Sequence, residues 1–361
     1  MPARLSIIVP FHKGLAFLEK ALDGVSPLRT GDELIIAADG AVDDCHALAA
    51  AYGARVIEIQ GPKGPAAARN AAAAIATGDV LVFVDADVVT SPDVLARTAA
   101  TFDARPDVAA VFGSYDDDPE APGYCSQYKN LAHAYVHRAS GGQAETFWAG
   151  FGAVRRHAFD QVGGFDERFE RPSIEDIDLG YRLTRQGFRI ELDPSLTVCH
   201  LKRWTLWSMV KSDVVDRGIP WTQLIHRYGG FGGGLNARPE YRLCVVLAYA
   251  TVAATLVGLV DARFLLLALA CAAVVVYLGR DYYGFFWRRR GAVFALRAVP
   301  LHFLYHLYNG VSFGVGTLLF VAARTFGVRL PGALPTQAAA PQVPRVGSSG
   351  DTSSAALSSS R

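Results

Sequence analysis

The stretch 79–89, Asp-Val-Leu-Val-Phe-Val-Asp-Ala-Asp-Val-Val, constrains the fold most, because it places two carboxylates at the end of a run suited to burial. Residues 80–84 are apolar without alternation, which is typical of a strand covered on both faces of a parallel sheet. Asp85 and Asp87 follow at once. Because residues two apart in an extended chain point to the same side, both carboxylates can reach one ligand at the carboxyl edge of the sheet, where open α/β sheets bind their ligands.

Paired hard oxygens suit Mg²⁺ or Mn²⁺, ions that share their coordination with substrate phosphates. A D-x-D alone is too short to be specific, because one Asp can cap the next turn while the other is solvated. His200 follows a later strand. It either completes a metal sphere, contacts a phosphate or serves as a structural hydrogen-bonding residue.

Strand and helix patterns alternate through the first 200 residues. Strands are expected at 5–10, 33–38, 55–59, 80–84, 108–112 and 188–192, with helices at 17–25 and 45–52 and after residues 64, 91 and 173. This alternation indicates βαβ units and therefore an α/β fold, a mostly parallel, doubly wound sheet flanked by helices.

Composition excludes several classes of protein. The formal net charge of +1 provides no field for a polyanion, which argues against nucleic acid as a partner. The five cysteines lack C-x-x-C spacing, so neither a zinc site nor a disulfide framework is indicated. The short apolar run at the N-terminus reads as a first strand rather than a signal peptide, so we expect the first half of the chain to stay in the cytoplasm.

The segment 61–70, Gly-Pro-Lys-Gly-Pro-Ala-Ala-Ala-Arg-Asn, is a glycine-bearing loop that opens onto a helix. It has neither the G-K-[ST] of a Walker loop nor the G-x-G-x-x-G of a dinucleotide fingerprint. Pro65 suits a first helical turn, whose free amides, with Arg69 one turn in, could hold a diphosphate. The alternative is an ordinary surface loop in which Arg69 pairs with a carboxylate.

Asp176 lies in an acidic cluster that starts a helix, and two interpretations compete for it. Ser173 and Asp176 have the spacing of a capping box, in which the carboxylate only satisfies backbone amides. Alternatively, Asp176 projects into a cleft as a general base that the helix N-terminus keeps ionised. Elsewhere, His133 and His137 lie one helical turn apart and are expected to face an acceptor groove rather than a metal.

The second half of the chain is much more apolar. Tryptophans and basic residues in 201–242 suit either packing on the first domain or a helix lying at the membrane surface. Apolar segments at 243–260, 264–278 and 299–323 predict about three membrane spans, with Arg-rich flanks on the cytoplasmic side. The third carries His302, His306 and Asn309, which are costly in lipid and are expected to face protein or a groove.

With these residues in hand, the chain resembles family 2 inverting glycosyltransferases of the GT-A fold, attached to the membrane through their C-terminus. The resemblance covers roughly residues 5–205. It rests on an ordered set of short motifs: Ile-Ile-Val-Pro10, Ala-Asp39-Gly, Gly64 to Asn70, Asp85-Ala-Asp87, Gly-Gly-Phe-Asp-Glu167 and Glu175-Asp176. Each motif is weak, but their joint order is specific.

The resemblance implies a role for each matching residue. Asp176 is the catalytic base. The expected donor nucleotide site comprises Pro10, Asp39, Arg69 and Asp85, and the expected metal ligands are Asp87, Asp85 and His200. The expected acceptor and diphosphate region comprises Glu175, Arg203, Trp204 and Trp148. His200-Leu-Lys-Arg203-Trp204 resembles the Q-x-x-R-W motif of processive synthases with His in place of Gln, a departure that leaves processivity open.

The expected domains are a GT-A catalytic domain at 1–200, interfacial helices and a Gly-rich joint at 201–242, a transmembrane region at 243–325 and a disordered tail at 326–361. The expected function is transfer of a sugar from a UDP- or GDP-sugar, with Mg²⁺ or Mn²⁺, to a lipid-linked or cell-envelope glycan acceptor at the inner membrane. Membrane lipid is therefore an expected partner. Two alternatives remain: a sugar nucleotidylyltransferase, and a catalytically silent membrane-bound scaffold that binds glycan or lipid.

Overall fold

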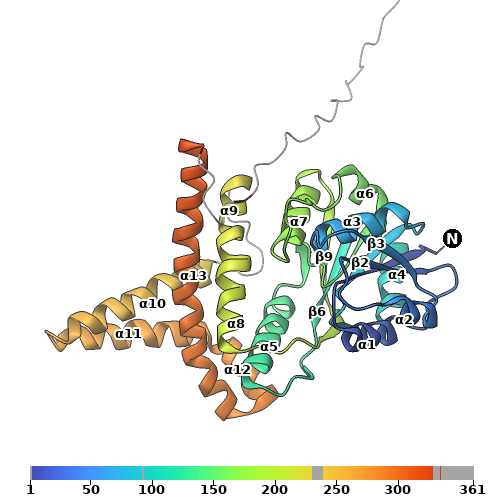
Figure 1. The fold of residues 1–361 in the computed structure, drawn as a ribbon. Coiled ribbons are helices and arrows are strands. Elements are labelled where there is room, and N and C mark those ends of the chain that lie inside the picture. The colour runs from blue at the N-terminus through green and yellow to red at the C-terminus, as the bar shows by residue number, and fades with distance from the viewer. Residues whose placement is uncertain (1, 92, 230–238, 328–333, 335–361) are drawn as a thin grey trace, which may run out of the picture.

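The computed structural model describes residues 2–91, 93–229, 239–327 and 334. Within these residues, strands form one sheet in the order β3-β2-β1-β4-β8-β6-β9-β5, with β7 paired to β9. The strands are β1 (Leu5–Phe11), β2 (Glu33–Asp39), β3 (Arg55–Ile59), β4 (Val80–Val84), β5 (Val88–Thr90), β6 (Val108–Tyr115), β7 (Gly142–Ala144), β8 (Phe151–Arg155) and β9 (Arg189–His200). Helices lie on both faces of this sheet (Figure 1).

The helices of this first half are short. They are α1 (Leu15–Val25), α2 (His46–Ala51), α3 (Pro65–Ile75), α4 (Val94–Ala104), α5 (Tyr124–Arg138), α6 (Arg156–Gln161) and α7 (Glu175–Arg185). The predicted α/β fold with flanking helices is confirmed. The sheet is mixed, however, where the sequence predicted a mostly parallel one: β3, β2, β1 and β4 run parallel, but β8 inserts antiparallel between β4 and β6.

Strand β9 is much longer than the predicted strand at 188–192. It starts parallel to β6, shifts register, and ends antiparallel to β5, where His200 lies opposite Val88. The backbone N–H of Leu201 also donates to the Asp87 carbonyl, at 2.9 Å. The extension therefore brings His200 beside the Asp85–Asp87 segment.

Buried aromatic rings support the end of β4. The Phe83 ring centroid lies 5.0 Å from that of Phe165 and 6.4 Å from that of Phe147. Val80–Val84 is buried throughout, as expected of a strand covered on both faces. Asp85 and Asp87, which follow β4, are therefore supported by a densely packed core.

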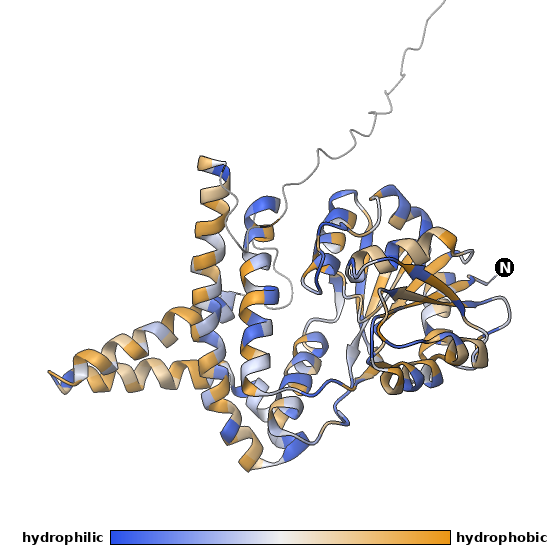
Figure 2. Ribbon diagram, viewed as in Figure 1, coloured by the Kyte–Doolittle hydropathy of each residue, from blue (hydrophilic) through white to orange (hydrophobic). Residues whose placement is uncertain are grey.

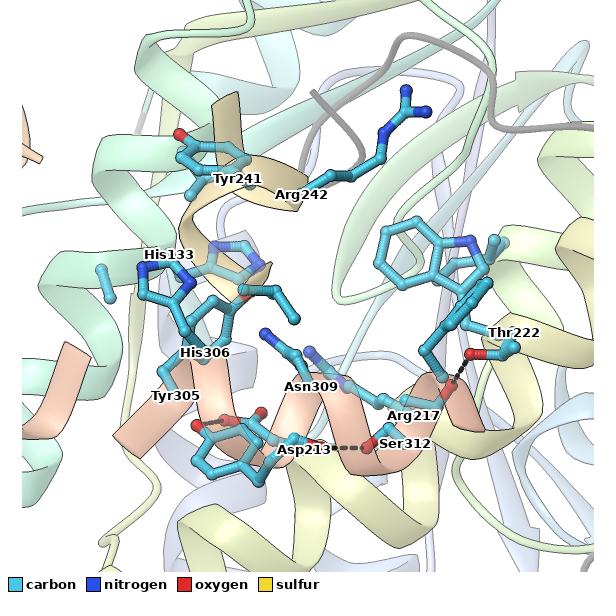
Figure 3. Close-up of a pocket in the computed structure, with 18 of the residues that line it drawn as sticks. His133, Asp213, Arg217, Thr222, Tyr241, Arg242, Tyr305, His306, Asn309 and Ser312 are labelled. Atoms are coloured by element: carbon cyan, nitrogen blue, oxygen red, sulfur yellow. Dashed lines mark hydrogen bonds between the residues drawn. The ribbon is translucent and has the colours of Figure 1, made fainter. Parts of the chain in front are cut away.

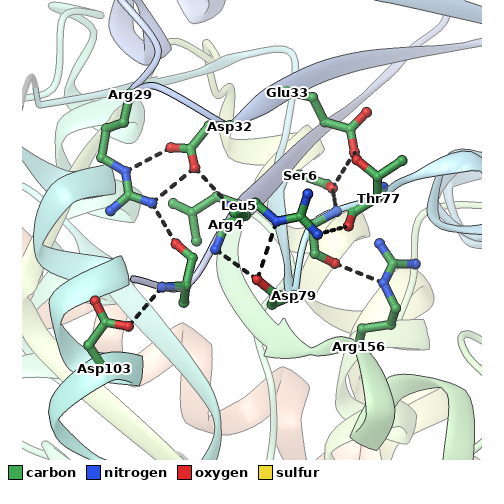
Figure 4. Close-up of polar contacts among 12 residues, drawn as sticks. Arg4, Leu5, Ser6, Arg29, Asp32, Glu33, Thr77, Asp79, Asp103 and Arg156 are labelled. Atoms are coloured by element: carbon green, nitrogen blue, oxygen red, sulfur yellow. Dashed lines mark hydrogen bonds and ion pairs between the residues drawn. The ribbon is translucent and has the colours of Figure 1, made fainter. Parts of the chain in front are cut away.

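At the opposite, amino edge of the sheet, the carboxylates of Asp32 and Glu33 accept structural hydrogen bonds (Figure 4). Asp32 accepts from the Leu5 N–H at 2.8 Å and pairs with Arg29. Burial acts to raise the pKa of Glu33, but hydrogen bonds from Thr77 and Ser6 lower it to about 2. These acids hold strand ends together and have no open face for a ligand.

A second group of helices follows the sheet. It comprises α8 (Leu206–Lys211), the π-helical segment η1 (Ser212–Gly218), α9 (Ile219–Tyr228), α10 (Pro239–Gly258), α11 (Arg263–Leu278), α12 (Arg280–Arg290) and α13 (Ala292–Phe326). Helix α9 runs alongside α13, while α10 and α11 form a hairpin that projects from the rest (Figure 1). Figure 2 shows that this hairpin is hydrophobic along most of its length.

Small residues bring α13 very close to the helices that follow the sheet. A Cβ placed on Gly218 would lie 2.7 Å from the Ser312 Oγ, and one on Gly316 would lie 2.6 Å from the Thr222 Cβ. Such distances leave no room for a larger side chain. Helices η1 and α9 are therefore packed directly against α13.

Two helices, Pro239–Gly258 and Ala292–Phe326, are long and apolar enough to cross a membrane, or up to three if the pair α11 and α12, bent by 61°, counts as one broken span. The predicted segments 243–260, 264–278 and 299–323 fall on α10, α11 and α13. The predicted Gly-rich joint after Gly229 and nearly all of the predicted tail at 326–361 lie outside the described residues.

Candidate active site

Three predicted residues, Pro10, Asp39 and Asp85, lie at the carboxyl ends of the neighbouring parallel strands β1, β2 and β4. Asp39 is buried, and its two carboxylate oxygens accept from the backbone N–H groups of Lys63 and Gly64, each at 2.7 Å. The Asp39 carboxylate therefore anchors the loop that opens onto α3.

Gly64 is required at the start of α3. Its φ is +96°, and a Cβ there would lie 2.5 Å from the Glu170 carbonyl oxygen. One turn later, the Asn70 side chain accepts from the Phe165 N–H and donates to the Phe165 carbonyl, both at 2.9 Å. These contacts explain why the motif at 64–70 and the Gly-Gly-Phe-Asp-Glu motif occur together, since each holds the other in place.

Arg69 is only 4% exposed and bridges two acids. Its Nη2 donates to Asp85 at 2.7 Å, and its Nη1 donates to Glu175 at 2.9 Å. Burial acts to lower the pKa of Arg69, but the two carboxylates outweigh it and keep the guanidinium charged. Arg69 thus pairs with carboxylates, as one of the two interpretations expected, although in a buried setting rather than on a surface loop, and this pairing orients Asp85. Binding of a diphosphate at this helix start stays a prediction.

Asp87 faces His200. The Asp87 Oδ2 lies 3.5 Å from His200 Nε2, and His200 Nδ1 lies 3.1 Å from the Asn130 Oδ1. Burial acts to raise the pKa of Asp87, but the hydrogen bond and charge of His200 lower it overall. The contact of His200 Nδ1 with Asn130 leaves Nε2 as the ring nitrogen that faces the Asp87 carboxylate.

The Asp87 carboxylate and the His200 imidazole are chemically suited to bind a divalent metal ion. A carboxylate oxygen beside an imidazole nitrogen with its second nitrogen held by a hydrogen bond is a common ligand arrangement for Mn²⁺-type metals. Within the described residues, no three His, Cys, Asp or Glu side chains form a ready-made metal site. An ion beside Asp87 and His200 would therefore take its other ligands from substrate and water.

Asp176 does not form the predicted capping box. The N-cap of α7 is Ile174, and the Ser173 N–H donates to Glu175 instead, at 2.9 Å. Asp176 accepts from the Ile177 N–H at 2.8 Å and from the Ala149 N–H at 3.1 Å. Burial, followed by the charge of Glu175, raises its pKa to about 6, whereas the helix N-terminus was expected to keep it strongly ionised.

A cavity of about 450 Å³ opens beside Asp176. Its walls come from α5, α7, η1, α9, α10, α12 and α13, so it lies between the sheet domain and the apolar helices (Figure 3). His133 and His137 line it, in agreement with the groove expected for them. The prediction that His302, His306 and Asn309 face protein or a groove is also confirmed, because all three line this cavity.

The four residues predicted for the acceptor and diphosphate region are not all together. Trp148 lines the cavity, but Glu175 is turned toward Arg69. Arg203 is exposed, and Trp204 packs under Lys202, whose Nζ lies 4.3 Å from the ring centroid. Neither Arg203 nor Trp204 lines the cavity beside Asp176.

Sequence reasoning missed the polar floor of this cavity. Asp213 pairs with Lys129 and accepts from the Tyr308 hydroxyl at 2.7 Å. Arg217, one of the basic residues of the segment 201–242, projects into the cavity.

Residues 6–163 match the model of the glycosyl transferase family 2, and residues 132–202 match that of the N-terminal domain of galactosyltransferase. Residues 6–163 are thus a glycosyltransferase family 2 domain. Among curated proteins, glucosyl-3-phosphoglycerate synthase of Mycobacterium tuberculosis is 35% identical over 96 residues, 24% of this chain and 29% of that protein.

N-acetylglucosaminyl-diphospho-decaprenol L-rhamnosyltransferase of the same organism is 53% identical over 49 residues, 14% of this chain and 16% of that protein. The chain thus spans less than a third of the length of both relatives. The chain shares its fold with the mannosyltransferase PcManGT from Pyrobaculum calidifontis, solved with GDP-Man and Mn²⁺, at a TM-score of 0.58 and 18% identity over 88% of each chain.

Proposed function

We propose that this chain is a membrane-associated inverting glycosyltransferase that moves a sugar from a UDP- or GDP-sugar to a lipid-linked or cell-envelope glycan acceptor. The observation that carries the proposal is Asp176. It is a partly buried carboxylate with a raised pKa, and it lines the cavity between the sheet domain and the apolar helices. A pKa of about 6 suits a general base that works near neutral pH.

In the proposed reaction, Asp176 takes the proton of an acceptor hydroxyl as that oxygen attacks the anomeric carbon. The bond from this carbon to the diphosphate breaks on the opposite face, so the configuration inverts and a nucleoside diphosphate leaves. Pro10 and Asp39 stand at the nucleotide end of the sheet edge. Arg69 acts through Asp85, because its guanidinium is buried between two carboxylates.

Asp87, Asp85 and His200 are the residues that would hold Mg²⁺ or Mn²⁺. When bound, the ion supplies positive charge to the diphosphate as it departs. Asn130 keeps the His200 ring in one orientation, and Arg69 keeps Asp85 in one position. Both supporting contacts restrict the ligands before any donor arrives.

The acceptor side of the proposal rests on where the cavity lies. α10 and α13, the two helices apolar enough to cross a membrane, supply part of its wall. One relative is named for a decaprenol-diphosphate acceptor. We place the sheet domain on the cytoplasmic side of the inner membrane, because Arg288, Arg289 and Arg290 cluster at the end of α12.

The test is a mass-spectrometric screen of nucleotide-sugar turnover by the purified full chain in detergent, with Mn²⁺ and Mg²⁺. A glycosyltransferase releases UDP or GDP and a free or transferred sugar. A nucleotidylyltransferase supplied with pyrophosphate would form a nucleoside triphosphate instead. A chain that turns over no nucleotide sugar in the presence of a lipid extract would contradict the proposal.

A further inference from the structure

The cavity beside Asp176 contains a cation that the proposed chemistry does not use. Arg217, on η1, extends into it near Asn309 (Figure 3). In the described part of the chain, the Arg217 guanidinium forms neither a hydrogen bond nor an ion pair. The Arg217 side chain is exposed to the solvent in the open cavity. The surrounding protein acts to lower its pKa by desolvation, but nearby acidic groups such as Tyr115 and Asp176 raise it, so the side chain stays charged.

The carboxylate of the same segment that lines the cavity, Asp213, is already occupied. Asp213 is paired with Lys129 through one oxygen and accepts from Tyr308 through the other. The Asp213 side chain is only 9% exposed, so it has little room for a further partner. The charge of Arg217 is therefore left for something that enters the cavity.

Two further polar groups on the cavity wall also lack partners. His306 is fully buried, and neither of its ring nitrogens has a hydrogen-bond partner. His133 Nδ1 is likewise buried and unpartnered. Buried polar groups are almost always hydrogen-bonded, so unpartnered ones that line one cavity indicate a site that receives a polar ligand.

Most of the remaining wall is apolar. Val245 and Val246 from α10, Phe313 from α13, and Val136 and Ile225 from the neighbouring helices line it. A ligand that satisfies both parts of the cavity has an anionic group at one end and a hydrocarbon chain at the other. Such a chain can continue along α10 and α13.

We propose that Arg217 binds the phosphate group of an amphiphilic lipid acceptor and so places the acceptor hydroxyl beside Asp176. This inference rests on the proposed function and specifies its acceptor class as a lipid phosphate or diphosphate ester. A guanidinium provides several donors in a planar fork that matches phosphate oxygens. His306 and His133 lie on the same wall and supply further hydrogen-bonding groups.

The test measures ligand binding to the full chain in detergent, without donor. Binding is detected as a change in tryptophan fluorescence, because Trp148 and Trp221 line the cavity. The probes are decyl phosphate, decanol and inorganic phosphate. We expect decyl phosphate to bind at least about tenfold more tightly than decanol. Arg217→Gln should abolish this preference, and Arg217→Lys should retain part of it. The matched control is Lys211→Gln, which removes an exposed positive charge outside the cavity and should change nothing.

Equal binding of decyl phosphate and decanol by the unmodified chain would overturn the inference, as would a preference that survives in Arg217→Gln. Inorganic phosphate that competes as well as decyl phosphate would also overturn it, because the site would then be one for free phosphate. A circular dichroism spectrum and a melting temperature equal to those of the unmodified chain show that Arg217→Gln folds. Absence of donor hydrolysis in the unmodified chain counts against the proposed function and leaves the binding result standing.

Discussion

The Asp176 carboxylate accepts a hydrogen bond of 3.1 Å from the backbone N–H of Ala149. The next residue, Gly150, accepts through its carbonyl from the Asp85 N–H at 3.2 Å. Consecutive residues of one segment therefore hold both the proposed base and a proposed donor ligand. The distance between the two carboxylates therefore depends on this segment as well as on α7 and the end of β4.

Asp176→Asn should lower the turnover number by about 10²–10⁴-fold, because it removes general-base catalysis and keeps the shape of the side chain. Donor affinity should stay within about twofold. Turnover and donor titration of the same preparation measure the two effects. Asp118→Asn, a change at a carboxylate that is 94% exposed, is the matched control. Wild-type turnover in Asp176→Asn would remove Asp176 from the mechanism.

The same substitution should stabilise the fold at pH 7 and above. Because burial raises the pKa of Asp176 to about 6, the folded chain holds this proton more tightly than the unfolded chain. Ionisation therefore reduces the free energy of unfolding as pH rises from about 4 to 6, by on the order of 3 kcal/mol at pH 7. Asn removes that cost. Melting temperatures at pH 5 and pH 8 test this, and an Asp176→Asn chain that is less stable at both would contradict it.

Transfer should depend on pH with an apparent pKa of about 6. A general base acts in its ionised form, so kcat/KM should rise with pH up to about 7 and then level off. The pH profile of the residual activity of Asp176→Asn should lack this rise. An identical rise in the variant would assign the titration to another group.

Loss of Asp87 should act on metal-dependent donor binding. Asp87→Ala should raise the Mn²⁺ concentration needed for half-maximal donor binding by about tenfold or more. Asn130→Leu, which removes the partner of His200 Nδ1 without touching the proposed ligands, should give a smaller shift in the same direction. Titration of UDP-sugar and GDP-sugar with and without Mn²⁺ measures both. Curves equal to those of the unmodified chain would place the ion elsewhere.

Arg69→Met should destabilise the fold severely, by roughly 3–5 kcal/mol, because it leaves Asp85 and Glu175 beside each other without their shared cation. Arg97→Met is the matched control, since its pairing with Asp93 at 3.5 Å is exposed and worth less than about 1 kcal/mol. Thermal unfolding compares them. Similar losses in both variants would show that Arg69 is not the central ion of this cluster.

Sequence patterns predicted the elements whose signal is local. The buried run before Asp85, the loop before Arg69 and the helix that starts at Glu175 all lie where expected. The antiparallel direction of β8 could not be predicted from the sequence, because an apolar segment reads the same whether its neighbouring strand runs parallel or antiparallel. The extent of β9 was missed because Pro194 lies within it.

The candidate site shows the same division. Asp39, Asp85 and Asp87 follow strands, so topology alone brings them to one edge. Arg217 and His306 come from helices far apart in the chain, and both line the cavity only because η1 and α13 pack together. No spacing rule links such residues before the packing is known. The same holds for the role of Glu175, which depends on its contact with Arg69.

The close approach of Gly218 to Ser312 and of Gly316 to Thr222 has a consequence for the substrate. These contacts pack η1 and α9 directly against α13, and the Ser173 hydroxyl, near the start of α7, donates to the Asp216 carbonyl of η1 at 2.6 Å. If α13 lies in the bilayer, this packing holds Asp176 at one height above the lipid. Only an acceptor whose reactive hydroxyl sits at that height would be glycosylated, whatever sugar the donor carries.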